Sequence, residues 1–64
     1  MENLDAMDPA DLREFAVVSR NLAEYALTKA CAMELRATGD IAGAQTREAQ
    51  CDAIYKSLPD WARW

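Results

Sequence analysis

Residues 10–38 contain neither glycine nor proline, and this uninterrupted run of helix-forming residues restricts the fold more than any other feature. Alanine, leucine, glutamate, arginine and methionine dominate the run, and these residues have the highest intrinsic helix propensities. Asp8-Pro9 precedes it as an N-cap followed by proline at the first helical position. Gly39 follows it as a C-terminal stop. The sequence therefore predicts one long helix over residues 9–38.

A second helical segment begins directly after that stop. Asp40 can cap it, and Pro59 ends it. We therefore expect a second helix over residues 41–58 and a short C-terminal turn over residues 61–64. Because a two-residue connection makes two helices run antiparallel, the predicted fold is all-α. It is a helical hairpin over residues 8–64, preceded by a flexible acidic N-terminal arm over residues 1–7.

Small and apolar side chains recur along the first helix at alternating spacings of three and four residues. This is the a/d pattern of a helix packed against another helix, so we expect this row to form the seam of the hairpin. The second helix continues the pattern, with Glu48 expected at the seam edge and paired with Lys29 or Arg47. The first row is Leu12, Ala16, Ser19, Ala23, Ala26, Ala30, Met33 and Ala37, and the second is Ile41, Ala44, Glu48, Cys51, Tyr55 and Leu58.

Residues 39–44 read GDIAGA and resemble the turn and second-helix start of a tetratricopeptide repeat. Upstream, Cys31, Ala32 and Leu35 match packing positions of that repeat's first helix, and Cys51 matches a small position of its second. The resemblance covers about half of the chain and implies a local antiparallel pair of helices. Because arrays of such repeats need about three copies to bury their faces, we interpret it as hairpin geometry.

The first helix is ~45 Å long at 1.5 Å per residue, and a kink near Ser19–Asn21 is one alternative for so long a helix. Without a kink, it is about a dozen residues longer than the second helix. Its N-terminal part therefore needs cover from the C-terminal tail or from another subunit. A weaker apolar row, with Val17, Cys31 and Leu35 and with Tyr25 nearby, is expected on the back of this helix. Because a helix that is apolar on two sides is usually central in a bundle, we expect a homodimer of hairpins forming a four-helix bundle.

The residue types that most enzymes and metal sites need are scarce in this chain. It has no histidine, its two cysteines are twenty residues apart without a CxxC pair, and it has no glycine-rich phosphate loop. We therefore expect neither catalysis nor a cofactor nor a metal. Apolar runs fall far short of the ~20 residues of a membrane span, and no signal peptide is evident. We expect a cytoplasmic protein.

The net charge of −4 arises from the N-terminal residues. Acidic residues recur there at every third position, and no basic patch suggests nucleic acid as a partner. The acids complement the dipole of the first helix, or they dock on a basic surface of a partner protein. They are Glu2, Asp5, Asp8, Asp11 and Glu14.

Two tryptophans near the end of the sequence are the other candidates for binding. Tryptophan and arginine are enriched in binding hot spots, and Arg63 lies between Trp61 and Trp64. Alternatively, both rings cap the open end of the hairpin core, since a large aromatic buries roughly 150–250 Å². We expect Trp61 to be the core ring and Trp64 the contact.

These patterns predict a small protein-interaction module. It would act as an accessory regulator or inhibitor by occupying a partner protein's surface, in analogy with compact accessory and anti-defence proteins of phages and plasmids. The alternatives are an RNA- or DNA-binding dimeric four-helix bundle and a structural assembly subunit. The predicted partner-binding residues are Asp5, Asp8, Asp11, Glu14, Val17, Tyr25, Leu35, Trp61 and Trp64.

Overall fold

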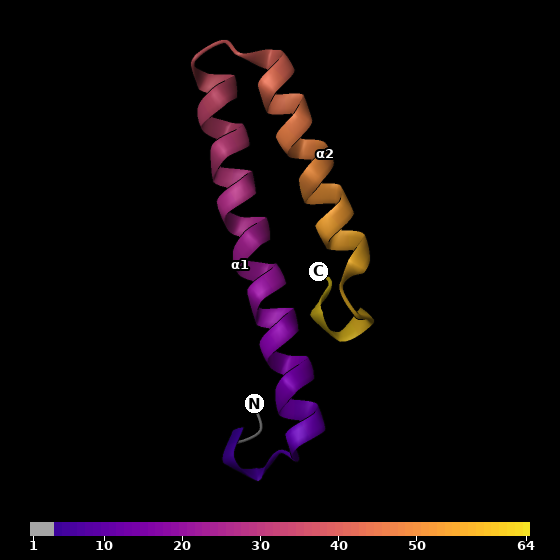
Figure 1. Cartoon of the computed structure of the whole chain (residues 1–64). Helices are drawn as coiled ribbons and strands as arrows, with labels where there is room; N and C mark the ends of the chain where they lie inside the picture. The colour runs from indigo at the N-terminus through magenta and orange to yellow at the C-terminus, as the bar shows by residue number, and fades with distance from the viewer. Residues whose placement is uncertain (1–3) are drawn as a thin grey trace.

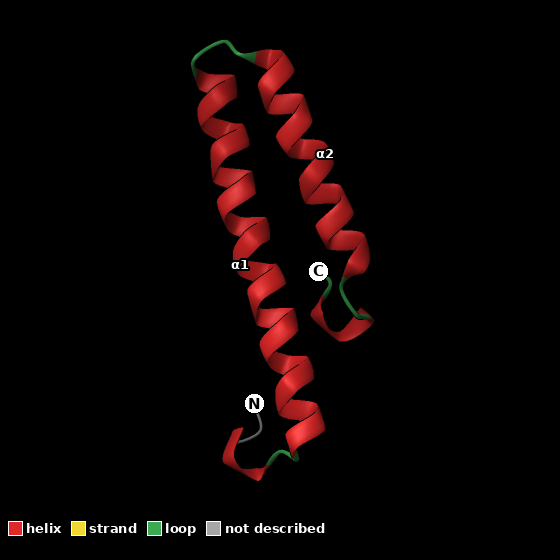
Figure 2. Ribbon diagram, viewed as in Figure 1, coloured by secondary structure: helices red, strands yellow, loops and turns green. Residues whose placement is uncertain are grey.

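The computed structural model describes residues 4–64 and shows two antiparallel helices joined by one tight turn (Figures 1 and 2). Helix α1 spans Pro9–Ala37 and helix α2 spans Ile41–Ser57. Short 3₁₀ turns at Leu4–Ala6 and Asp60–Ala62 flank them, and no strand occurs within the described residues. The all-α helical hairpin is therefore confirmed, and both helices end within a residue of their predicted bounds.

Helix α1 begins where the sequence predicts. The Asp8 carboxylate Oδ1 accepts the backbone N–H of Asp11 at 2.9 Å, and Pro9 occupies the first helical position. This N-cap satisfies one of the four N–H groups that a helix start leaves without an internal partner. The helix then continues without interruption to Ala37. It extends well beyond the C-terminal end of α2, so that its N-terminal part has no α2 beside it (Figure 1).

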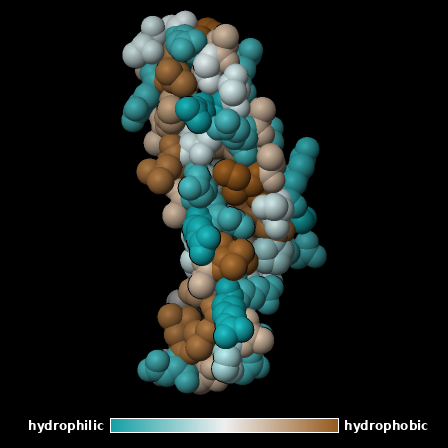
Figure 3. Space-filling model, in the orientation of Figure 1, coloured by the Kyte–Doolittle hydropathy of each residue, from teal (hydrophilic) through white to brown (hydrophobic). Residues whose placement is uncertain are grey.

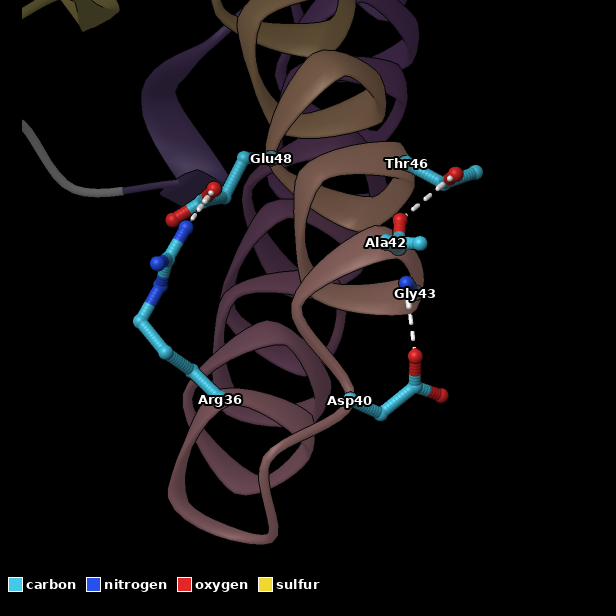
Figure 4. A network of polar contacts seen from close by, with 6 residues as sticks. All are labelled: Arg36, Asp40, Ala42, Gly43, Thr46 and Glu48. Atoms are coloured by element: carbon cyan, nitrogen blue, oxygen red, sulfur yellow. Dashed lines mark hydrogen bonds and ion pairs between the residues drawn. The ribbon is translucent and has the colours of Figure 1, made fainter.

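The turn between the helices is a Schellman motif. The N–H of Asp40 donates to the carbonyl of Leu35 at 2.9 Å, and the N–H of Gly39 donates to that of Arg36 at 3.2 Å. Gly39 adopts a φ of 89°, which a residue without a Cβ reaches at least cost. Asp40 then caps α2, since its Oδ1 accepts the N–H of Gly43 at 2.9 Å (Figure 4). One three-residue segment therefore ends α1 and starts α2.

The face that α1 turns toward α2 differs from the predicted one. Ala32 and Val18 are the buried residues of α1, whereas Ala23, Ala26 and Ala30 are exposed. Ala16, Met33 and Ala37 are exposed too, so the predicted seam on α1 is wrong. The residues of the actual seam lie along a different side of the helix, most of them also three or four residues apart. They are Val18, Asn21, Leu22, Tyr25, Thr28, Ala32 and Leu35, each buried or half-buried.

Tyr25 and Leu35, predicted to lie on the back of α1, therefore belong to the side that packs on α2. The physical reason is the apolar area that each row removes from water. Burial stabilises in proportion to that area, at roughly 25 cal/mol per Å². A row containing valine, leucine and tyrosine buries much more area than a row made mainly of alanine. Packing positions taken from the repeat resemblance, Ala32 and Leu35, are on the buried side as that resemblance implies.

The prediction for α2 agrees better with the structure. Ala44, Cys51 and Leu58 are buried at 0%, 3% and 1% exposure, and Glu48 and Tyr55 are half-buried beside them. Ile41, at the turn, is exposed instead. Small residues at Ala32 and Ala44 let the two helix backbones approach closely. The resulting core is narrow, and the molecule measures 47 × 17 × 17 Å.

Candidate interaction surface

The surface of α1 that faces away from α2 carries several apolar side chains that the fold leaves exposed. Leu27 and Met33 are 70% and 64% exposed, and Leu12 is 38% exposed. In a helix of 3.6 residues per turn, these side chains share one side with the exposed alanines. We call this set the outer row of α1. It comprises Leu12, Ala16, Ser19, Ala23, Ala26, Leu27, Ala30, Met33 and Ala37, of which Ser19 alone is half-buried.

Three charged residues flank the outer row on one side: Arg13, Arg20 and Glu34. Arg13 lies near the N-terminal end of α1 and Glu34 near its C-terminal end, and both are exposed. They occupy the same position of the seven-residue repeat that places the alanines at 16, 23, 30 and 37. Neither side chain forms an ion pair or hydrogen bond within the part of the chain that the structure describes. Their charges are therefore free to meet those of another chain.

Hydrophobic side chains also emerge elsewhere on the surface. Val17 is 52% exposed on α1, and Trp61 is 60% exposed in the C-terminal turn. Figure 3 shows hydrophobic groups as separate patches among hydrophilic ones along the whole length of one face. Val17, Tyr25 and Leu35 do not form one continuous surface, because the latter two pack toward α2.

The C-terminal turn folds back onto the hairpin through Trp64. Its ring stands edge-on to Tyr25 of α1, with centroids 4.8 Å apart, and edge-on to Tyr55 of α2, with centroids 4.9 Å apart. The hydroxyl of Tyr55 donates a hydrogen bond to the backbone carbonyl of Trp64. Neither tryptophan is a core residue, because Trp61 and Trp64 are 60% and 65% exposed. Trp64 makes the intramolecular ring contacts, and Trp61 makes none.

Arg63 fixes the same turn, a role that the sequence analysis missed. Its Nε donates to the carbonyl of Leu58 at 2.9 Å, and a second guanidinium nitrogen pairs with Asp60 Oδ1 at 3.3 Å. The carbonyls at the end of α2 have no partner within the helix, and a nearby arginine satisfies one of them. An arginine within the turn that follows a helix was the available signal.

Glu48 pairs with a partner that differs from the two predicted ones. Its Oε1 accepts a hydrogen bond from Arg36 of α1 at 2.6 Å, close to the turn (Figure 4). Arg47 instead donates to Gln50 at 3.1 Å. Because side chains of both partners remain 38–47% exposed, water screens the pair and it contributes little to stability. It joins α1 to α2 beside the turn.

The acidic residues of the predicted binding set lie at the N-terminal end of α1. Asp8 is committed to the N-cap, whereas Asp11 and Glu14 are exposed on the first turns. Asp5 belongs to the 3₁₀ turn Leu4–Ala6. Glu2, the remaining acid of the predicted arm, lies outside the described residues. This end is the part of α1 farthest from the Gly39 turn (Figure 1).

Both cysteines are free thiols, and Cys51 is the buried one. Its Sγ lies 3.9 Å from the carbonyl oxygen of Tyr25, to which the thiol donates. Burial raises the pKa of this thiol above its ordinary value, Asp52 and Glu48 add to the increase, and Lys29 opposes it. A buried thiol that stays protonated is a poor nucleophile.

The described residues define the protein as a small helical hairpin with an uncovered outer row. Comparisons with protein-family models, with curated proteins and with solved structures found no match for the chain. Within residues 4–64, neither helix is both long and apolar enough to cross a bilayer. Nor does the described part bring together three or more histidine, cysteine, aspartate or glutamate residues as a possible metal site.

Proposed function

We propose that the protein is an interaction module that acts as a small accessory regulator or inhibitor by occupying the surface of a partner protein. The observation that carries the proposal is the balance between buried and exposed hydrophobic groups. Among residues 4–64, the core consists of Val18, Ala32, Ala44, Cys51 and Leu58, while eight large hydrophobic side chains are exposed. Exposed apolar surface of this extent in a small protein is typical of a contact site for another chain.

The surface area supports this proposal. A folded monomer of 7.1 kDa is expected to expose about 4,100 Å². This chain exposes 4844 Å². The excess of roughly 700 Å² is close to the ~800 Å² that each partner buries in a standard protein interface. We propose that part of this excess is covered in a homodimer of hairpins with four helices in all.

The acidic end of α1 supplies charge for a heterologous contact. Asp11 and Glu14 are exposed there, and Asp5 lies in the preceding turn. Such groups attract a basic surface and increase the association rate, and salt weakens the effect. The exposed side chains of Trp61 and Val17 would supply the apolar part of the contact.

The experiment is affinity purification of the tagged protein from its native host, followed by binding measurements with the purified partner. The Asp5→Asn/Asp8→Asn/Asp11→Asn variant is expected to bind more slowly and with weaker salt dependence. Asparagine at position 8 keeps the N-cap, because it is as good an acceptor there as aspartate. Asp52→Asn, which removes an exposed carboxylate of α2, is the control. If the triple variant bound the partner at the wild-type rate and with the wild-type salt dependence, the result would contradict the proposal.

A further inference from the structure

The outer row of α1 repeats the a/d pattern of a helix seam, although α2 packs on the opposite side of α1. We infer that a second copy of this chain covers the outer row, with the two α1 helices antiparallel and in contact over residues 12–37. The inference deepens the proposed function by naming the occupant of this surface and its register. The two α2 helices then lie on the outer sides of the assembly.

Side-chain size selects this arrangement. In an antiparallel pair, a and d positions of the two helices share layers, and a two-fold axis near residues 23–26 makes residue i level with residue 49 − i. Leu12 then packs on Ala37 of the second copy, and Met33 packs on its Ala16. Each large side chain thus faces a small one, which fills the interface without clashes. A parallel pair would stack Leu12 on Leu12 and Met33 on Met33, and would leave gaps between the alanines.

Charge is consistent with the same arrangement. In a two-fold symmetric antiparallel pair, each flank of a helix meets the same flank of its partner. Arg13 and Glu34 share one flank, and in this register they differ in level by two residues, or about 3 Å along the axis. Arg13 of each copy therefore reaches Glu34 of the other, so that the dimer contains this ion pair twice. Neither residue has a partner within the described hairpin.

The overlap covers nearly all of α1. Residues 12–37 of one copy run beside residues 12–37 of the other, so that most of the N-terminal part of α1, which α2 does not reach, is covered. Moving the register by seven residues in either direction leaves Leu12 or Met33 without an opposing alanine. The fit in size and the placed charges favour a second copy over a chemically unrelated partner. The ~700 Å² of excess surface is about what one chain of such a pair buries.

Site-specific cross-linking tests the geometry. In a Cys31→Ser/Cys51→Ala background, chains carrying Ser19→Cys and chains carrying Ala30→Cys are oxidised separately and as an equal mixture. The antiparallel dimer predicts disulfide-linked dimers in the mixture only, because positions 19 and 19 of the two copies are ~16 Å apart along the axis. A parallel pair would link each variant to itself. Ala42→Cys, an exposed position on α2, is the control and should remain unlinked.

Sedimentation velocity tests the ion pair. Arg13→Glu and Glu34→Arg should each raise the dimer dissociation constant by about tenfold, because two attractive contacts become repulsive. The double variant should restore the wild-type value. Lys56→Glu, with the same change of charge on α2, should have little effect. Circular dichroism verifies that each variant remains helical.

The outcomes separate this inference from the proposed function. A wild-type chain that remains monomeric at millimolar concentration overturns the inference, whereas the partner-binding measurements still decide the proposed function. A dimer that cross-links in the parallel pattern overturns the inference as well. So does a dimer dissociation constant that neither charge reversal changes. Cross-links in the mixture together with rescue by the double variant support it.

Discussion

Trp64 lies edge-on against Tyr25, with the ring planes at 83° and the centroids 4.8 Å apart, although Tyr25 is in the middle of α1 and Trp64 follows α2. The same indole makes a second edge-on contact, with Tyr55, and this contact joins the C-terminal turn to α2. One side chain thus ties the turn to both helices at the end opposite Gly39.

Removing this ring should open that end of the molecule. Edge-on aromatic pairs contribute about 0.5–1.5 kcal/mol each, so Trp64→Ala should lower the free energy of unfolding by about 1–2 kcal/mol. Trp61→Ala is the matched control. It should cost less than about 0.5 kcal/mol, because Trp61 makes no ring contact. Urea denaturation followed by circular dichroism measures both, and equal losses would contradict the assignment of Trp64 as the structural ring.

The φ of Gly39 leads to a prediction about the turn. Gly39→Ala should lower the free energy of unfolding by about 1–2 kcal/mol, because a residue with a Cβ is strained at a φ of 89°. The cause is conformational, since a Cβ built at this position meets no atom within 4 Å. Gly39→Asn should cost less than Gly39→Ala, because asparagine tolerates positive φ better. Thermal unfolding compares the two variants, and equal costs would argue against this explanation.

The N-cap of α1 separates hydrogen bonding from charge. Asp8→Ala should destabilise the protein by about 0.5–2 kcal/mol, since the N–H of Asp11 loses its acceptor. Asp8→Asn should be nearly neutral, because the amide oxygen replaces the carboxylate oxygen. Hydrogen exchange at the first turn of α1 reports the loss directly. If Asp8→Asn destabilised as much as Asp8→Ala, charge rather than the cap would be responsible.

The close approach of the helices depends on small residues at the actual seam. Ala44 is completely buried, so Ala44→Leu should lower the free energy of unfolding by about 1–3 kcal/mol through overpacking. Ala42→Leu, on the exposed side of the same helix, should change it by less than about 0.5 kcal/mol. Chemical denaturation of the two variants tests whether the face of α2 is assigned correctly.

The buried thiol of Cys51 makes stability depend on pH in the alkaline range. Burial raises its pKa in the folded state, so the unfolded chain releases the proton at lower pH than the folded one. The stability that the protonated Cys51 thiol contributes is complete below the ordinary thiol pKa. It is lost as the pH rises through the pKa of the folded state. Unfolding free energies between about pH 7 and pH 10 should therefore fall less steeply for Cys51→Ala than for the wild type. Cys31→Ala, at the more exposed thiol, is the control.

Local signals allowed the helices and their ends to be predicted, because caps act within a few residues. Asp8 and Asp40 each cap a helix start through a side-chain hydrogen bond. Gly39 ends α1 through a positive φ that its missing Cβ permits. Glycine at 39 and proline at 59 leave little choice of boundary. These features do not depend on how the helices pack.

Which face of α1 packs on α2 depends on how much apolar area each of two similarly spaced rows would bury. Regular alanines made the outer row conspicuous, but periodicity does not measure buried area. Val18, Leu22 and Tyr25 belong to the other row, and they remove more apolar surface from water than the alanines do. The pairing of Glu48 with Arg36 follows from that choice, because rotating α1 brings Arg36 to the seam edge. The aromatic contacts of Trp64 depend in turn on the fold of the C-terminal turn.

The single turn at Gly39 also sets the order in which the hairpin can assemble. Arg36 and Glu48 are 12 residues apart along the chain, whereas Tyr25 and Cys51 are 26 apart. Because the entropy lost on closing a loop grows with its length, contacts beside Gly39 form at least cost and distant ones follow. The two helices therefore pack against each other progressively from the turn. They fray first at the C-terminal end of α2, where Trp64 contacts Tyr25.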